Sequence, residues 1–203
     1  GPSGCGKSTL LNAIAGFSLP SGGRITVNGA LVSAPGPDRG MVFQEYALFP
    51  WMTVEQNIAF GLEIQKVAPE QIRDRVTSLL SMLHLTDFRN SFPKDLSGGM
   101  RQRVAIARVL ALDSPIMLMD EPFGALDALT RRNLQDEILK IWVTLGKTIV
   151  FVTHSIEESI YLADRIVVMT YRPGTVKRDL LVDIPRPRDP ASARFNELKR
   201  ELG

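Results

Sequence analysis

Apolar residues along the chain alternate between short uninterrupted runs and a helical spacing. The runs lie at residues 116–119 and within the predicted strands 148–152 and 165–169, and they are bounded by polar or turn-forming residues, which is typical of strands buried on both faces of a parallel sheet. Between the first two runs, apolar side chains recur with the period of a helix that packs one face into the core: Leu134, Ile138, Ile141, Trp142 and Leu145. This order of elements predicts an α/β fold.

Residues 53–112 interrupt the alternation with predicted helices. Thr53 and Gln56 have the spacing of a capping box, which predicts a helix reaching about residue 64, and Pro69 starts a second helix reaching about residue 85. Shorter elements are expected elsewhere: a helix at 10–15, strands at 24–28 and 41–44, and a last helix at 191–202. We therefore expect a core formed by 1–52 and 113–190, a helical subdomain at 53–112, and a C-terminal helix in 191–203.

Composition narrows the class of protein. Hydrophobic residues make up 44% and charged residues 23%, close to the average for folded soluble domains. The apolar runs are far shorter than the roughly 18 to 20 residues of a membrane-spanning helix. Cys5 is the only cysteine, which excludes an internal disulfide and fits a reducing compartment. With 24 Lys and Arg against 22 Asp and Glu, charge argues against a nucleic-acid-binding surface.

The first nine residues match the phosphate-binding pattern G-x-x-x-x-G-K-[ST]. Gly1 and Gly6 let backbone N–H groups converge on phosphate oxygens, Lys7 supplies positive charge, and Ser8 is a candidate Mg²⁺ ligand. A glycine-rich turn without a ligand is the alternative. We expect a bound nucleotide to contact the whole loop: Gly1, Pro2, Ser3, Gly4, Cys5, Gly6, Lys7, Ser8 and Thr9.

Two adjacent carboxylates follow the first apolar run. Asp120 comes directly after residues 116–119, so a buried strand would deliver it to the carboxyl edge of the sheet, where α/β folds bind ligands. It suits Mg²⁺ binding, directly or through an intervening group. Glu121 points elsewhere and is a candidate to take a proton from a water that attacks a γ-phosphate. An ordinary loop with two acidic residues is the alternative.

His154 follows the second apolar run, at the same predicted sheet edge as Asp120. This position favours a functional histidine over a structural one. Ser155 and Glu158 have the spacing of a capping box for the next helix.

A further helix start is marked by Ser97, Gly98 and Gly99, ahead of a helix predicted from Met100 to about residue 112. The free N–H groups of a helix N-terminus bind anions. The sequence therefore indicates either a second phosphate site or an ordinary helix cap.

Taken together, these motifs resemble the ATP-binding subunits of ABC transporters. The chain carries in order the phosphate loop, Gln44, LSGGMRQR at 96–103, IMLMDEP at 116–122, ALD at 125–127, and His154. The resemblance covers essentially the whole chain and implies a P-loop NTPase (RecA-like) fold, with a parallel-sheet core and an inserted helical subdomain. It also implies that N-terminal strands of the fold, and an aromatic residue that stacks on adenine, are missing from this fragment.

The same resemblance implies the roles of individual residues. ATP would be sandwiched between two copies of the domain, with the phosphate loop of one facing Ser97, Gly98 and Gly99 of the other. Mg²⁺ would be held by Ser8, Gln44 and Asp120. The remaining roles are as follows: Glu121 as general base, Gln44 also at the attacking water, His154 at the γ-phosphate, Gln102 on the nucleotide-binding surface, and Asp127 joining the two sites.

The expected partners also come from the resemblance. Residues 46–51 are unusually aromatic and include Tyr46, Phe49 and Trp51; in the family this region forms the groove for a permease's coupling helix, and buried core is the alternative. Segments 35–40 and 183–189 look like those of nitrate, sulfonate and taurine importers. We therefore expect a second ATPase subunit, a transmembrane permease, an extracytoplasmic solute-binding protein, and a peripheral location on the cytoplasmic face of the plasma membrane.

A soluble ABC-type ATPase that acts on nucleic acid or ribosomes is the alternative, since it would use the same site residues. The sequence lacks the long coiled-coil insert, the second ATPase domain and the strongly basic surface that would favour it. A GTPase is disfavoured because no Asn-Lys-x-Asp motif occurs. We therefore expect no nucleic-acid partner.

Overall fold

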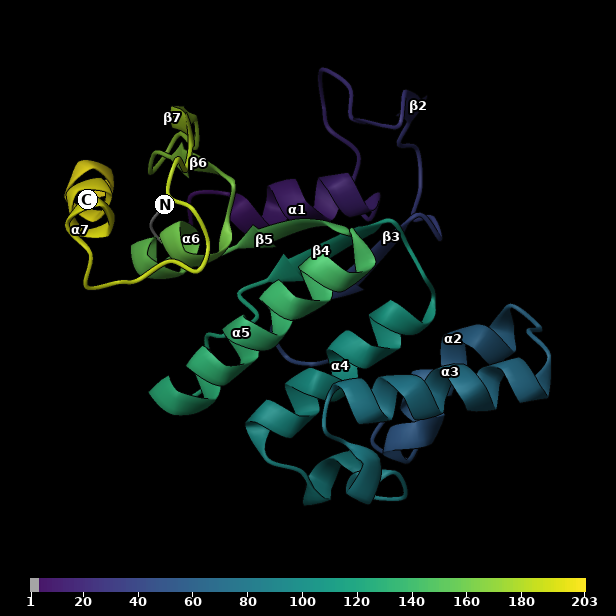
Figure 1. Cartoon of the computed structure of the whole chain (residues 1–203). Coiled ribbons are helices and arrows are strands. Elements are labelled where there is room, and N and C mark those ends of the chain that lie inside the picture. The colour runs from purple at the N-terminus through teal and green to yellow at the C-terminus, as the bar shows by residue number, and fades with distance from the viewer. Residues whose placement is uncertain (1–3) are drawn as a thin grey trace. The chain divides into compact units, whose positions relative to one another are not determined.

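The computed structural model describes residues 4–203 (Figure 1). The chain divides into two compact units, and each is described by itself. One unit consists of residues 12–151, and the other combines residues 4–11 with 152–203. Gly1, Pro2 and Ser3 of the predicted phosphate loop lie outside the described residues.

A parallel three-stranded sheet is built from β3 (Arg39–Val42), β4 (Ile116–Asp120) and β5 (Thr148–Val152), in that order. β3 pairs with β4 from Arg39 opposite Ile116 to Val42 opposite Met119. The apolar run of β4 supplies three almost fully buried side chains, as expected for a central strand. β3 begins and ends two residues earlier than predicted, because its pairing with β4 stops at Val42. Gln44 therefore lies in the loop that follows.

Helix α5 (Ala128–Leu145) follows β4 and buries Leu134, Ile138 and Ile141 as predicted. Asp127 caps its first turn by accepting from the backbone N–H groups of Leu129 and Thr130 at 3.1 and 3.0 Å. The prediction was wrong for Leu145, which is 38% exposed because it lies in the last turn, next to the glycine that ends the helix. Trp142 is only half-buried.

The segment between β3 and β4 is helical, with α2 (Val54–Ile64), α3 (Pro69–Met82), α4 (Gly98–Ala111), and the short 3-10 turns η1 (Thr86–Phe88) and η2 (Pro93–Asp95). The capping box at Thr53 and Gln56 is confirmed in both of its hydrogen bonds. α3 ends three residues earlier than predicted, and α4 begins two residues earlier, on Gly98. The apolar faces of these helices form a core of their own: Val54, Ile58, Val76, Leu80, Val104 and Ile106.

A short hairpin, β1 (Thr26–Val27) and β2 (Ala30–Leu31), precedes the sheet. Its two-residue turn is Asn28-Gly29, with both residues in the left-handed region at φ 51° and 82°. This is the turn chemistry that Asn-Gly favours. The predicted strand at 24–28 is thus the first arm of a hairpin.

The second unit contains α6 (Ile156–Leu162), the antiparallel pair β6 (Arg165–Met169) and β7 (Val176–Leu181), and α7 (Ala193–Leu202). Helix α1 (Lys7–Ala15) begins in this unit and continues into the other. Arg188 is buried and donates to the backbone carbonyls of Ile160, Ala163 and Ile184 at 2.7 to 2.8 Å. The guanidinium thereby closes the carboxyl end of α6. β7 was not predicted, and α7 begins two residues late, capped by Ser192.

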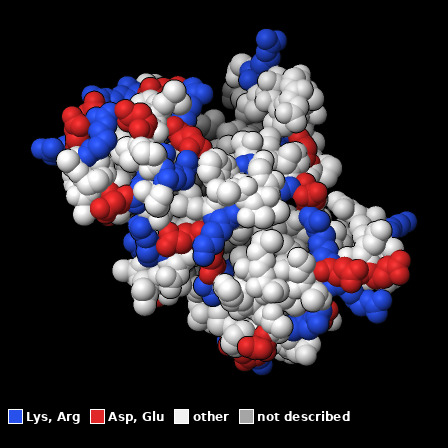
Figure 2. Space-filling view, in the orientation of Figure 1, with Lys and Arg blue, Asp and Glu red and all other residues white. Residues whose placement is uncertain are grey.

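Positive and negative side chains are interspersed on the face drawn in Figure 2, without a broad positive area in that view. Among the described residues, none of the helices combines the length and the apolar character that crossing a membrane requires.

Candidate functional site

The described part of the predicted phosphate loop turns at two glycines before α1 begins. Gly4 and Gly6 lie in the left-handed region at φ 77° and 92°, which side chains other than glycine rarely adopt. The N–H of Leu10 donates to the carbonyl of Gly6 at 2.9 Å, so α1 begins directly on the loop. Because the first N–H groups of a helix have no acceptor within the helix itself, a helix N-terminus attracts anions.

Lys7 is the first residue of α1, and its ammonium lies 3.8 Å from the Sγ of buried Cys5. The lysine therefore lies along the loop. Ser8 and Thr9 are exposed in the same turn. A Cβ on Gly174, in the β6–β7 turn, would lie 2.1 Å from the carbonyl oxygen of Cys5. Only glycine fits there, and its packing against the loop was missed in the sequence, although Pro173-Gly174 is a recognisable turn signal.

His154 lies in the same unit, exposed at the end of β5. Ser155 caps α6 as predicted, accepting from the N–H of Glu158 at 3.3 Å. The second half of the predicted capping box is wrong, because the Glu158 carboxylate accepts from the Thr153 hydroxyl at 2.5 Å instead. Thr153 in turn accepts from the N–H of Ser155 at 3.0 Å. These bonds fix the backbone on both sides of His154.

The two adjacent carboxylates lie in the other unit. Asp120 is the last residue of β4, and Glu121 has φ 44°. A non-glycine residue in this region costs of order 1–3 kcal/mol and is held there by its surroundings. The N–H of Gly124 donates to the carbonyl of Glu121 at 3.1 Å, and Phe123 is buried behind the turn. The strand and the turn therefore hold both carboxylates, half-buried, at the carboxyl edge of the sheet.

Ser97, Gly98, Gly99 and Asp127 come together in the same unit as the carboxylates. Ser97 caps α4 by accepting from the N–H of Met100 at 3.3 Å. A Cβ on Gly99 would lie 2.5 Å from the Cγ2 of Thr130, in the first turn of α5. The beginnings of α4 and α5 are thus in contact, with Ser97 and Asp127 both exposed. Hydrogen bonds from Thr130 and from backbone N–H groups lower the pKa of Asp127.

Arg103 and Glu137 join the same two helices farther along. The guanidinium donates two parallel hydrogen bonds to the carboxylate at 2.9 and 2.7 Å, the strongest geometry for such a pair. Gln102, on α4 between Arg101 and Arg103, is only 1% exposed, and its Nε2 has no hydrogen-bond partner among the described residues. A nucleotide contact would require this side chain to move.

The loop after Gln44 carries an exposed aromatic surface. Gln44 itself is exposed. Phe49 packs against Trp51 and Phe60, with ring centroids 5.7 and 4.6 Å apart, and Trp51 is 69% exposed. We call Phe49, Trp51 and Phe60 the aromatic patch. Its exposure favours the partner groove over buried core.

Asn57 holds the backbone of the loop that carries Phe49 and Trp51. It is fully buried, accepts from the N–H of Phe49 at 2.9 Å, and donates to the carbonyls of Phe49, Met52 and Thr53 at 3.0 to 3.2 Å. No sequence pattern predicts this role, because the asparagine lies within a helix.

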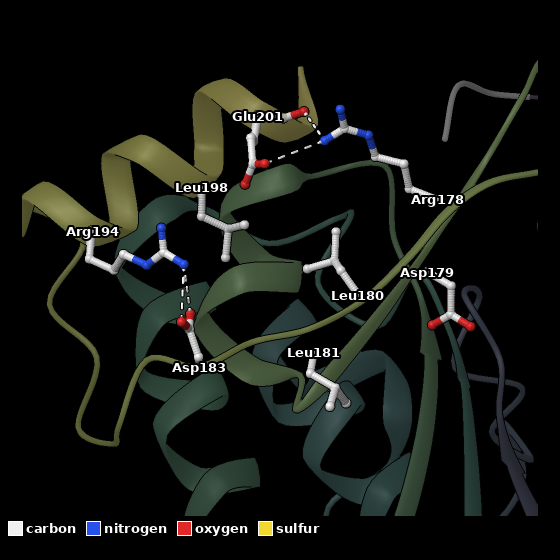
Figure 3. Close-up of a pocket in the computed structure, with 8 residues that line it drawn as sticks. All are labelled: Arg178, Asp179, Leu180, Leu181, Asp183, Arg194, Leu198 and Glu201. Atoms are coloured by element: carbon white, nitrogen blue, oxygen red, sulfur yellow. Dashed lines mark hydrogen bonds and ion pairs between the residues drawn. The ribbon is translucent and has the colours of Figure 1, made fainter.

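A cavity of about 380 Å³ lies between β7 and α7 (Figure 3). Its charged side chains are already paired: Arg178 with Glu201, Arg194 with Asp183, and Asp179 with Arg165 outside the lining. None of the predicted site residues lines it. The cavity therefore contributes neither free charge nor predicted chemistry.

The possible Mg²⁺ ligands are a hydroxyl on Ser8, an amide oxygen on Gln44 and a carboxylate on Asp120. These are the hard oxygen donors that Mg²⁺ prefers, and nucleotide-bound Mg²⁺ commonly uses only one or two protein carboxylates. Within residues 4–203, no three His, Cys, Asp or Glu side chains gather as a metal site. The donor set fits a metal that is bound together with phosphate.

Comparison with known proteins gives one consistent result. The family model described as ABC transporter matches residues 1–124. The chain is 47% identical to the nitrate import ATP-binding protein NrtD of Synechocystis sp., over 99% of this chain and 76% of that protein. It is 48% identical to the aliphatic sulfonates import ATP-binding protein SsuB of Bacillus licheniformis, over 100% of this chain and 78% of that protein.

A solved structure with a similar fold is an ATP-binding cassette, captured as a dimer in a post-hydrolysis state bound to ADP and Pi. It superimposes with a TM-score of 0.77 at 34% identity, over 89% of this chain and 82% of that one. The P-loop NTPase fold expected from the motifs is therefore confirmed. With the family match covering more than half of the residues, the chain belongs to the ABC transporter family, as an ATP-binding subunit that hydrolyses ATP.

Proposed function

We propose that two copies of this chain bind ATP between them and use its hydrolysis to drive the import of a small solute. The observation that carries the proposal is the joint start of α4 and α5, where exposed Ser97 and Asp127 lie beside a helix N-terminus suited to phosphate. The phosphate loop is a second such N-terminus on the same chain. A dimeric relative that holds ADP and Pi supports an arrangement in which each site uses both.

Each site residue then has a defined task. Glu121 accepts a proton from water as the water oxygen bonds to the γ-phosphorus and ADP departs. Gln44 orients that water, and His154 donates to a γ-phosphate oxygen. Lys7 and the loop N–H groups neutralise phosphate charge. Mg²⁺, held by Ser8, Gln44 and Asp120, would neutralise further charge on the phosphates.

The Gly99–Thr130 contact provides a test of the predicted phosphate site at Ser97, Gly98 and Gly99. Gly99→Ala would place a methyl group 2.5 Å from the Thr130 Cγ2 and push α4 away from α5. Since a shift of about 1 Å at a reacting centre can cost up to about 100-fold in rate, we expect a loss of roughly tenfold or more in ATPase kcat. Thr130→Ser removes the Cγ2 methyl and keeps the hydroxyl, so the double variant should regain most of the rate. Failure of that rescue would argue against steric displacement as the cause.

The import direction and the solute class rest on the relatives. NrtD and SsuB are named for nitrate and aliphatic sulfonates, so we propose a small anion of this kind as the solute. Import further requires a permease and a solute-binding protein outside the membrane. The chain would then act as a peripheral subunit on the cytoplasmic face of the plasma membrane.

The aromatic patch is the proposed permease contact. Trp51→Ala would remove most of the exposed apolar area and leave Asn57 and the buried part of the loop intact. We expect the full-length variant to keep its basal ATPase rate and lose the permease during extraction of native membranes in mild detergent without ATP. Mass spectrometry of the co-purified proteins provides the measurement.

The matched control is Phe88→Ala, an exposed aromatic outside the patch, which should retain the permease. A soluble nucleic-acid or ribosomal partner, with no polytopic protein, would contradict the proposal and favour the alternative class.

A further inference from the structure

Arg108, near the end of α4, contacts the loop that follows Gln44. Its Nη1 donates to the carbonyl of Ala47 at 2.7 Å, and its Nη2 donates to the carbonyl of Tyr46 at 3.4 Å. The guanidinium carbon also lies 5.5 Å from the ring centroid of Phe49, in cation–π range. One side chain of the helical segment thus holds two consecutive backbone carbonyls and an aromatic ring of the loop.

The backbone held by Arg108 is strained. Tyr46 and Ala47 both lie in the left-handed region, at φ 62° and 48°. Two adjacent non-glycine residues in this conformation are unfavourable, and they persist only when their surroundings enforce it. Within the loop itself, the N–H groups of Tyr46 and Ala47 donate to the carbonyls of Phe43 and Glu45. The acceptors on the outside of the turn face Arg108.

The same turn reaches the start of α4. Arg101 lies 5.7 Å from the Tyr46 ring centroid, and a Cβ on Gly98 would lie 3.3 Å from the Tyr46 hydroxyl. The loop is therefore attached to α4 at both ends of the helix, beside Gly98 and at Arg108. At its far end, the loop continues into the aromatic patch, which Asn57 fixes to α2.

We propose that Arg108 is a positioning residue that latches residues 45–49 in their strained conformation. The latch sets the position of Gln44 and makes the aromatic patch and helix α4 move together. A partner seated on the patch would thereby act on Gly98 and Ser97 through one rigid connection. The coupling part of this inference rests on the proposed docking of a permease at the patch, whereas the latch itself does not.

Arg75 provides a control, because it also donates to two backbone carbonyls in the same unit, and none of these contacts involves residues 45–49. Its guanidinium donates to the carbonyls of Ala111 and Leu110 at 2.8 and 3.0 Å, and it is half-buried like Arg108. Arg75→Met and Arg108→Met each remove two bonds to carbonyls; Arg75→Met also removes an ion pair with exposed Asp113 at 3.4 Å, and Arg108→Met removes the Phe49 contact. A change seen only in Arg108→Met therefore results from the lost contacts to residues 45–49. A change shared by both variants results from lower stability of the unit.

The first measurement is hydrogen–deuterium exchange on the full-length protein. In Arg108→Met, we expect the peptide that covers residues 43–50 to lose roughly tenfold in protection, the scale expected when charge-assisted hydrogen bonds are removed. Arg75→Met should leave that peptide unchanged, and Arg108→Lys, which retains one donor group, should be intermediate. Unchanged protection of residues 43–50 in Arg108→Met would overturn the latch.

The second measurement is ATPase kinetics in proteoliposomes that contain the permease. Because the phosphate loop is untouched, Arg108→Met should keep KM for ATP within about twofold and lose roughly tenfold in kcat, with partial recovery in Arg108→Lys. An equal kcat loss in Arg75→Met would reduce Arg108 to a structural residue and overturn the coupling. If the wild-type protein captures no permease, the proposed function fails, while the exchange result still decides the latch.

Discussion

Glu121→Gln in the full-length protein should slow ATP hydrolysis by roughly 10²- to 10⁴-fold, the usual contribution of a general base. The glutamine keeps the shape of the side chain and its hydrogen-bonding capacity, so the left-handed turn at residue 121 should persist. The negative charge and the ability to accept a proton are lost. ATP should still bind. The variant should accumulate as an ATP-bound dimer, because ATP hydrolysis, which we expect to open the dimer, is blocked.

Single-turnover hydrolysis measures the chemical step, and light scattering after size exclusion measures the dimer. Glu63→Gln is the matched control, because Glu63 is an exposed carboxylate on α2, and it should behave as the wild type. Near-normal turnover in Glu121→Gln would remove Glu121 from the role of general base.

Lys7→Ala should abolish tight nucleotide binding, with Kd raised by at least roughly 100-fold. The ammonium lies along the loop, beside Cys5, and a buried charge-assisted contact to a phosphate is worth roughly 2–5 kcal/mol when one partner is removed. The glycine backbone and the N-terminus of α1 would remain, so weak binding should survive. Titration calorimetry with ATP measures the change.

Lys147→Ala is the control for charge. Lys147 pairs with Asp113 at 2.5 Å and is outside the phosphate loop. Its loss changes the net charge by the same amount, and ATP affinity should stay constant. An unchanged ATP affinity in Lys7→Ala would contradict the assignment of the loop.

Short-range sequence patterns correctly predicted helix caps, because a cap depends on hydrogen bonds between neighbouring residues. The capping box at Thr53 and Gln56 and the cap at Ser97 depend on residues within one turn of each other. Competition between local partners explains the error at Glu158, because Thr153 donates to the Glu158 carboxylate and itself accepts from the N–H of Ser155. β7 could not be predicted, because half of its six residues are polar, its apolar residues do not alternate with them, and its formation depends on pairing with β6.

The motifs predicted the site residues, but not the contacts that hold them. Arg108 and Ala47 are 61 positions apart, and the contact of Gly99 with Thr130 joins two helices separated by a strand. Periodicity carries no information about such pairs. The burial of Gln102 could not be predicted from the sequence either, because glutamine side chains are mostly exposed.

The most direct test of the whole account is solute uptake by proteoliposomes that contain the full-length protein and its co-purified permease, supplied with the solute-binding protein. We expect isotope-labelled nitrate or an alkanesulfonate to accumulate only when ATP is present on the side of this subunit, and Glu121→Gln to abolish the uptake. Uptake that proceeds equally well without ATP, or with Glu121→Gln in place of the wild type, would contradict the claim that hydrolysis by this chain drives import.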